Sequence, residues 1–525
     1  MPVLFKALIA VMVLTVATFY VARPLMRRFM SDSDFTVRRN VWLGLTLAAF
    51  LIPDYWFYVL VASAILIVGL RRDSNPAALY LFLLLAMVPS GLNLPTFGVV
   101  NQIFRLDHLR LLSLVILLPS ALQLARSTGP SNLHGPSLDR SRLHADLLLL
   151  GYVVLQVVLL VRYESFTSTL RRVILIGLDV WLPYYVLSRG CRTREQAVDA
   201  MAAFALAMFV LAPLAVVEAA KGWLFYVGLQ EHLGTQHIFN YLRRGGVLRA
   251  TVTSGQPIVL GYAMAVGFGF WLFLQTRVNS RAWWWLAMLT LVAGLIVPSA
   301  RGPWLGAATI VIVFLALGPN RSGRISKAIV LLTVAGAAIL ASPYGDTVID
   351  RIPFVGSLDA GAVSYREELA ATSWQIIQQN PWFGTPGFVE QMESLRQGQG
   401  IIDVVNAYAG IGLAFGLVDV ALFLGLFLYA AVQCTRGIRT LRSSDPELSL
   451  MGASLVACIA AVLLMLATVN LYLSVGYLTW ALAGLAIGYA GIVRRHEGSI
   501  AEPGVRPAGS PAERAFAPVR AAGTK

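Results

Sequence analysis

Arg301 is the residue whose type and position point most directly to chemistry. It lies between two apolar stretches, Ala282–Val297 and Trp304–Leu317, each long enough to form most of a membrane helix. An arginine near the bilayer centre costs about 2.5–3.5 kcal/mol, so this side chain is expected at the membrane edge. A guanidinium held there can bind a phosphate that is attached to a lipid, because its planar fork of donors matches phosphate oxygens.

A second group of arginines lies in the segment 219–255, which is predicted on the same side of the membrane. Arg249 is, like Arg301, within a few residues of an apolar run, and Arg244 precedes it. Guanidiniums from separate segments could converge on one diphosphate. Alternatively, each side chain extends to lipid headgroups or pairs with a nearby carboxylate.

A third arginine, Arg366, belongs to a long polar segment at 343–405. Ser364 and Glu367 have the spacing of a capping box there, which predicts that a helix begins at this point and runs to about Gln379. Polar loops of this length are usually functional. Arg366 is therefore the third candidate for the diphosphate, and Glu367 is the carboxylate that could pair with it instead.

Two histidines in the segment 219–255 are candidates for acid–base chemistry. His232 and His237 are five residues apart without a third ligand nearby, so a zinc site is not expected. Either could serve as a general base, because histidine titrates near neutrality. The pair Asp32 and Asp34 resembles the paired aspartates of metal-dependent glycosyltransferases, but its arginine-rich surroundings favour a solvated loop, and no metal is expected.

The elements that must position these residues are apolar helices. Of the 525 residues, 57% are hydrophobic and 13% are charged, against about a quarter charged in a soluble protein. Repeated apolar runs predict an all-α fold, a polytopic transmembrane helical bundle of about 12–15 crossings. The predicted segments are 3–22, 40–52, 56–70, 77–91, 110–126, 146–161, 173–188, 199–217, 256–275, 282–298, 303–318, 326–342, 407–433, 450–469 and 473–493.

The arginines between these segments set the predicted topology. The net charge of +14 does not indicate nucleic-acid binding, because most arginines cluster in short loops, as the positive-inside rule requires. One such basic loop holds Arg23, Arg27, Arg28, Arg38 and Arg39. The amino terminus is then outside and the carboxyl terminus inside. Residues 1–495 form one membrane domain that contains the outer loops 219–255 and 343–405, and the Pro-, Gly- and Ala-rich residues 496–525 form a disordered cytoplasmic tail.

Several short motifs follow one another along residues 240–430. They are Leu248-Arg249-Ala250-Thr251 with Gln256-Pro257, Ser299-Ala300-Arg301-Gly302-Pro303-Trp304, Tyr365-Arg366 with Trp374, Asn380-Pro381-Trp382-Phe383-Gly384, and Val405-Asn406-Ala407-Tyr408 with Gly416-Leu417-Val418. Their order resembles that of the O-antigen ligase and O-antigen polymerase superfamily of bacterial envelope enzymes. The amino-terminal half matches only as a series of helices.

The resemblance implies a metal-independent, cofactor-free glycosyltransferase in the bacterial inner membrane, with its active site and both outer loops facing the periplasm. Such an enzyme takes a glycan from undecaprenyl diphosphate and passes it to a hydroxyl of an acceptor glycan. Arg249 and Arg301 would hold the diphosphate and offset charge on the leaving group. Arg366 would orient donor or acceptor, with Arg244, Glu367 and Asn406 as further substrate-binding residues.

One departure from the family pattern bears on the mechanism. The ligases carry a histidine directly before the asparagine that corresponds to Asn406, and here that position is Val405. Asp403 is the nearest candidate for a general base, with Glu367, His232 and His237 as further options. The missing histidine favours a polymerase of O-antigen or exopolysaccharide repeat units, with a possible chain-length regulator as partner, over a ligase that transfers glycan to lipid A core.

A flippase for lipid-linked sugars is the alternative from a different class. A flippase places charged residues along a path at the bilayer midplane. The predicted spans are almost free of charge, with Asp179 and Asp419 as exceptions. Charge concentrates at the outer rim, which favours an enzyme acting at the interface between membrane and water.

Overall fold

A computed structural model describes residues 2–94, 104–127, 140–318, 360–385, 387–396, 402 and 404–501. Within these residues, nine helices are long and apolar enough to cross a membrane, so the predicted all-α, multi-pass fold is confirmed. The candidate spans are formed by α1 (Pro2–Met26), α3 (Tyr55–Arg72), the run α5 (His108–Leu112), η1 (Ser113–Leu117) and α6 (Leu118–Ser127), α7 (Arg140–Val161), α10 (Arg194–Lys221), α12 (Pro257–Leu274) with η5 (Gln275–Arg277), α19 (Ala407–Leu441), α20 (Pro446–Leu466) and α21 (Ser474–Ala501).

Shorter elements complete the bundle. Two apolar helices, α13 (Arg281–Ile296) and α14 (Arg301–Leu317), flank the turn that carries Arg301. The remaining elements are α2 (Asp32–Leu51), α4 (Pro76–Leu83), α8 (Phe166–Ile176), η3 (Gly177–Trp181), α9 (Leu182–Gly190), α11 (Val227–His232), η4 (Val252–Ser254), α17 (Ala360–Gln379), α18 (Phe388–Gln391) and η6 (Glu393–Leu395), with the antiparallel pairs β1 (Gly91–Asn93)–β2 (Arg105–Asp107) and β3 (Arg243–Arg244)–β4 (Val247–Leu248).

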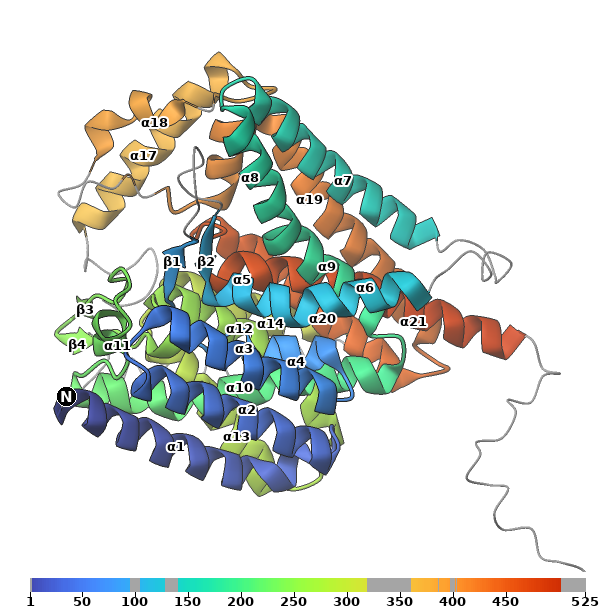
Figure 1. Ribbon diagram of the computed structural model, residues 1–525. Coiled ribbons are helices and arrows are strands. Elements are labelled where there is room, and N and C mark those ends of the chain that lie inside the picture. Colours follow the sequence, from blue (N-terminus) through green and yellow to red (C-terminus); the bar gives the residue numbers. More distant parts are fainter. Residues whose placement is uncertain are drawn as a thin grey trace, which may run out of the picture.

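The β3–β4 hairpin and the helices α11, α17 and α18 lie at one end of the bundle. Figure 1 shows the β3–β4 hairpin, α11 and the amino terminus on the left, with α17 and α18 above them, while α21 ends on the far right. The first residues of α1 share a small cavity with residues 223–232, which places the amino terminus and the segment 219–255 on one side.

The centre of the bundle consists of helices with small residues at their contacts. α10, α12 and α21 are almost wholly buried, whereas α1, α3 and α7 expose apolar side chains outward. Gly267 on α12 approaches Met208 on α10 so closely that a Cβ added to Gly267 would lie 2.4 Å from the Met208 Cγ. Small residues let helix backbones approach, which is how membrane helices gain packing energy.

Two predicted segments differ from the structure. The segment 77–91 is not a membrane-length helix, because α4 ends at Leu83 and the buried chain then turns into β1; Pro89 disfavours helical geometry in the residue before it. The segment 173–188 belongs to α8, η3 and α9, a helical run containing a π turn. α21 extends to Ala501, past the predicted start of the tail, and the predicted span 326–342 and residues 502–525 lie outside the described residues.

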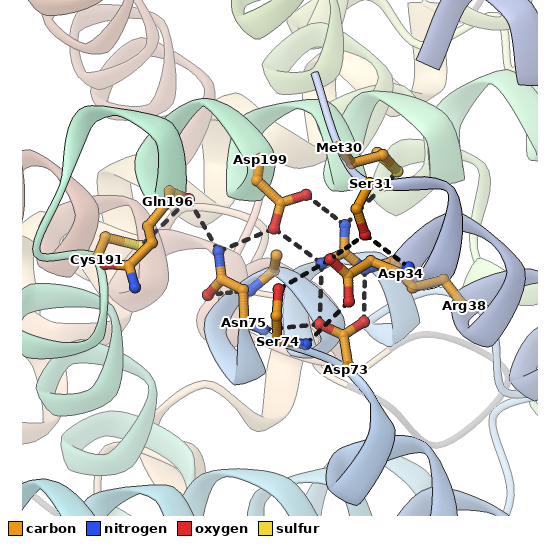
Figure 2. Close-up of polar contacts among 11 residues, drawn as sticks. Met30, Ser31, Asp34, Arg38, Asp73, Ser74, Asn75, Cys191, Gln196 and Asp199 are labelled. Carbon is orange, nitrogen blue, oxygen red and sulfur yellow. Dashed lines mark hydrogen bonds and ion pairs between the residues drawn. The ribbon is translucent and has the colours of Figure 1, made fainter. Parts of the chain in front are cut away.

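The basic loop predicted around Arg38 is also different. Arg38 lies on α2 with its side chain fully buried, and it binds two carboxylates (Figure 2): its Nε donates to Asp73 Oδ2 over 2.7 Å, and its Nη2 donates to Asp199 Oδ2 over 2.8 Å. Asp34, predicted in a solvated loop, is buried in the first turn of the same helix and accepts from Ser74. Burial of an arginine is tolerated because the carboxylates neutralise it.

Candidate active site

The turn between α13 and α14 presents Arg301 at the first position of α14. Ser299 in this turn has a positive φ of 49°, a conformation that is sparsely populated by residues other than glycine and that clusters at functional sites. Ala300 precedes the helix and supplies no side-chain cap, and no acidic residue stands in the first turn. A positive side chain at a helix amino terminus opposes the helix dipole, so this end of α14 is suited to an anion.

The β3–β4 hairpin lies against the same turn. Gly245 and Gly246 form its tip with φ values of 55° and 75°, which is the pattern of a tight two-residue hairpin turn. Arg244 Nη1 donates to the Ser299 carbonyl over 2.6 Å, and Arg249 Nε donates to the Pro298 carbonyl over 3.0 Å. The structure therefore brings Arg244 and Arg249 to the two residues that precede Ala300 and Arg301.

A buried carboxylate holds the chain that follows Arg249. Glu218, near the end of α10, is fully buried, and its Oε2 accepts from the backbone N–H groups of Thr251 and Val252 over 3.1 and 2.9 Å. Val252 has a positive φ of 46°, a genuine strain for a β-branched residue. Sequence reasoning missed this positioning residue, although an acidic residue near the end of an apolar run is itself a signal.

The start of α14 also packs against the end of α20 and the loop that follows it. A Cβ at Gly302 would lie 2.3 Å from Thr468 Oγ1, and one at Gly306 would lie 2.6 Å from Met465 Sδ. Leu473 at the end of this loop has a positive φ of 48°. Among the described residues, three residues other than glycine have positive φ: Val252 begins η4, Ser299 lies in the turn before α14, and Leu473 directly precedes α21.

The long outer segment 343–405 contributes a small separate core. Leu369 and Ile377 of α17 pack with Met392, Leu395 and Leu413. Arg366 and Glu367 are exposed on α17, and the side chain of neither makes a hydrogen bond or an ion pair within the part of the chain that the structure describes. The structure therefore does not bring Arg366 into contact with the hairpin or with the turn of Arg301.

Two motifs from the sequence dock on each other beside this core. α19 is broken at Gly416 (φ 81°, ψ 178°), and the turn after α17 fills the break. Leu417 N donates to the Pro381 carbonyl over 2.7 Å, and Thr385 N donates to the Leu413 carbonyl over 2.7 Å. A Cβ at Gly416 would lie 2.2 Å from the Trp382 carbonyl oxygen, so only glycine fits.

The residues at the start of α19 have structural roles. Asn406 is the N-cap of the helix, and its Oδ1 accepts from Tyr408 N and Ala409 N over 2.9 and 3.1 Å. Val405, at the position of the family histidine, packs against the small core of the outer segment. Asp403 lies outside the described residues, so its predicted role as general base is untested.

The two histidines of the first outer segment are apart. His232 ends α11 and lines the small cavity of 410 Å³ beside the start of α1, whereas His237 is exposed in the following loop. Among the described residues, no three His, Cys, Asp or Glu side chains gather as a metal site requires.

A polar cavity of 510 Å³ opens between α5, α7, η3 and α21. On its wall, Arg110 Nη2 donates to Asp179 Oδ2 over 2.9 Å, and the Tyr477 hydroxyl donates to the other oxygen of Asp179. Asp107 caps α5 and pairs with Arg110 over 3.2 Å; burial raises the pKa of its carboxyl, and Arg110 opposes that rise. Sequence reasoning missed this group, because its members come from distant segments of the chain.

A second cavity of 670 Å³ adjoins the first and reaches the outer segment, where Phe388, Arg396 and Ile402 line it. The two cavities share five lining residues. These are Tyr152, Gln156, Arg172, Leu471 and Tyr472.

The fold and the clustered arginines define a multi-pass α-helical membrane protein with a basic turn and a polar cavity at one end. Residues 286–424 match the family model described as O-Antigen ligase. This match confirms the resemblance to the O-antigen ligase and O-antigen polymerase superfamily. It covers α14 and α17 with Arg301 and Arg366, and the break at Gly416, whereas Arg244 and Arg249 precede it. No curated protein matches the chain.

Proposed function

We propose that this protein is a glycosyltransferase of the bacterial inner membrane that polymerises undecaprenyl-diphosphate-linked oligosaccharide repeat units at the periplasmic face. The product is O-antigen or exopolysaccharide. The observation that carries the proposal is the docking of Arg244 and Arg249 on the carbonyls of Ser299 and Pro298, next to Arg301. The family match across residues 286–424 supports the same reaction class.

In the proposed reaction, a hydroxyl oxygen of the acceptor glycan attacks the anomeric carbon of the donor glycan. The bond from that carbon to the diphosphate oxygen breaks, and undecaprenyl diphosphate leaves with the electron pair. Arg249 and Arg301 bind the diphosphate and offset the charge that grows on it, while the amino terminus of α14 adds its dipole. Loss of one such contact typically raises the barrier by about 2.7–4 kcal/mol.

The hydroxyl proton must pass to a general base. Asp403 is our candidate, and Asn406 fixes the start of α19 three residues later. Glu367, His232 and His237 are the alternatives. An Asp403→Asn variant is expected to lower turnover more than donor binding. Normal turnover in that variant would move the assignment to Glu367 or to one of the histidines.

A ligase is the second candidate, because the matching family model carries that description. Val405 at the family's histidine position argues for the polymerase. The two are separated by incubating purified protein, with a chelator present, with lipid-linked repeat unit alone or together with lipid A core. Polymer formed from repeat unit alone supports the polymerase, and transfer that requires lipid A core supports the ligase. A product that forms only when metal is restored would contradict metal independence.

A flippase remains the alternative of a different class. The buried charges Arg38, Asp73 and Asp199 pair with one another and so do not form an open polar path. Translocation of a fluorescent lipid-linked sugar across vesicles containing the protein, without polymer, would favour the flippase.

A further inference from the structure

We propose that the 510 Å³ cavity walled by Arg110, Asp179 and Tyr477 is a binding site for an uncharged sugar ring of the glycan. This inference rests on the proposed function and extends it from the lipid diphosphate to the sugars. The diphosphate role uses none of these three residues, and the family match at 286–424 contains none of them.

The hydrogen-bonding groups on the wall fit sugar hydroxyls. A hydroxyl is both a donor and an acceptor, so its site needs both kinds of partner. The Asp179 side chain is 25% exposed and that of Arg110 is 16% exposed, so both remain accessible although they bind each other. The Tyr477 hydroxyl and two further hydrogen bonds between Arg110 Nε and Asp179, of 3.2 and 3.3 Å, fix the pair. Such preorganised polar groups give a pocket its specificity.

Aromatic residues supply the apolar part of the site. Tyr152 and Trp480 line the cavity, with ring centroids 5.3 Å apart. Both rings are almost fully buried, with Tyr152 5% and Trp480 2% exposed, so they offer the C–H groups of a sugar an apolar edge to contact. Gln156, on the same wall, is fixed by a 2.8 Å hydrogen bond from its Nε2 to Asp419, whose second carboxylate oxygen is buried without a hydrogen-bond partner among the described residues.

The charges on the wall argue against other ligands. Asp107 and Asp179 would repel a phosphate, and they pair with Arg110. Of the two other arginines that line the cavity, Arg105 donates to Gln236, and the side chain of Arg172 is 58% exposed and lies 3.8 Å from Glu164. A hydrocarbon chain would leave these polar groups desolvated without partners, which is unfavourable. An uncharged sugar meets neither objection.

The cavity lies close to the turn of Arg301. Thr468, which Gly302 contacts, and Tyr472, which lines the cavity, are four residues apart in one loop. Their Cα atoms are therefore separated by at most about 14 Å. The turn of Arg301 and the cavity therefore border the same short loop, so an oligosaccharide bound in the cavity can extend along this loop toward the diphosphate.

The test measures sugar binding to the purified full-length protein in lipid nanodiscs. The probe is the free oligosaccharide that mild acid releases from the lipid-linked pool of the producing cells, followed by ligand-observed NMR. Leu175→Trp fills the cavity from α8, and Val173→Trp places the same ring on the exposed side of that helix as a control. We expect roughly tenfold weaker binding in Leu175→Trp, in Asp179→Asn and in Tyr477→Phe, and wild-type binding in Val173→Trp. Tyr477→Phe removes a single hydroxyl, so it keeps the test valid if a larger change prevents folding.

Unchanged oligosaccharide binding in the folded cavity variants would overturn this proposal. Binding of inorganic pyrophosphate tests the diphosphate site separately. Arg301→Ala should abolish this binding, and the cavity variants should leave it intact. Loss of pyrophosphate binding in the cavity variants, equal to that in Arg301→Ala, would also count against a sugar site.

A second experiment distinguishes whether the cavity binds the acceptor glycan or the donor glycan. If the cavity binds the acceptor, wild-type protein elongates the free oligosaccharide with units from the lipid-linked donor, and Leu175→Trp does not. If it binds the donor glycan, the free oligosaccharide inhibits polymerisation without being elongated, and Leu175→Trp relieves the inhibition. Elongation or inhibition that is identical in wild type and Leu175→Trp would contradict the proposal.

Discussion

Arg301 stands at the amino-terminal position of α14, where the helix dipole favours an anion. Arg244 and Arg249 add two further guanidiniums at the same turn, each set by a hydrogen bond to a backbone carbonyl. Three guanidiniums carried by one turn and the hairpin beside it are suited to binding a diphosphate. At the scale of single residues, the proposed chemistry therefore depends on how these arginines are positioned as well as on their charge.

Substitutions of Arg249 test whether the position of the guanidinium matters as well as its charge. Arg249→Ala should lower polymer formation by about 10²–10³-fold, in line with loss of one donor to a developing anion. Arg249→Lys keeps the charge but loses the Nε donor to Pro298 and the planar fork, so an intermediate activity is expected. Activity is measured as polymer formed per unit time from lipid-linked repeat unit. Arg243→Ala, exposed on the same hairpin, is the control, and equal activity in Arg243→Ala and Arg249→Ala would refute the special role of Arg249.

Close contacts at glycines, where no larger side chain would fit, position the elements that carry the candidate site. Gly302 brings α14 against the loop after α20, and Gly416 opens α19 for the turn after α17. Both glycines and the turn at 380–384 belong to motifs that can be recognised in the sequence. The sequence does not indicate that this turn fills the break in α19, because the contact joins segments whose pairing depends on the whole fold. Substitution of either glycine should therefore disturb the contact between the two elements that meet there.

Gly302→Ala should displace the start of α14, because its Cβ would lie 2.3 Å from Thr468 Oγ1. Thr468→Ala removes that atom and leaves the Thr468 Cβ, 3.4 Å away, as the nearest neighbour from this residue. We therefore expect Gly302→Ala to lower polymerising activity and the double variant to recover most of it. Activity that is as low in the double variant as in Gly302→Ala would show that the contact is not what the glycine protects.

Gly416→Ala should release the outer segment from α19, because the residue has a positive φ and a Cβ there would meet the Trp382 backbone at 2.2 Å. Gly410→Ala, on the same helix with its nearest neighbour 3.5 Å away, is the matched control. Limited proteolysis from the outer side should cleave the segment after α17 faster in Gly416→Ala alone. Equal cleavage rates in both variants would mean that the docked turn does not hold the segment.

The whole molecule is a bundle whose inner helices are packed through small residues and joined by buried charges. Composition was enough to predict a multi-pass all-α protein, and apolar runs next to arginines made Arg249 and Arg301 candidates for the site. Charge pattern alone could not distinguish Arg38, which is buried and paired, from its exposed neighbours in sequence. Asp179 stands out in the sequence as a charge within a predicted span, but its grouping with Arg110 and Tyr477 does not, because nothing local in the sequence signals that three distant segments meet.

Arg38 gives the prediction for global stability. Arg38→Ala leaves Asp73 and Asp199 buried without their cation, which should cost about 3–5 kcal/mol. The thermal unfolding midpoint in nanodiscs should fall clearly, while Arg39→Ala, whose side chain binds only Asn40 in the described structure, should unfold close to wild type. Matching midpoints for the two variants would exclude a stabilising role for the buried network.

The central claim is that Arg301 binds the diphosphate of a lipid-linked donor that the protein polymerises. The most direct measurement incubates purified wild-type protein and Arg301→Ala, at equal amounts of folded protein, with lipid-linked repeat unit as sole substrate and follows polymer length. The account predicts growing polymers with wild type and none with Arg301→Ala. Polymers of unchanged length and amount from Arg301→Ala would contradict it.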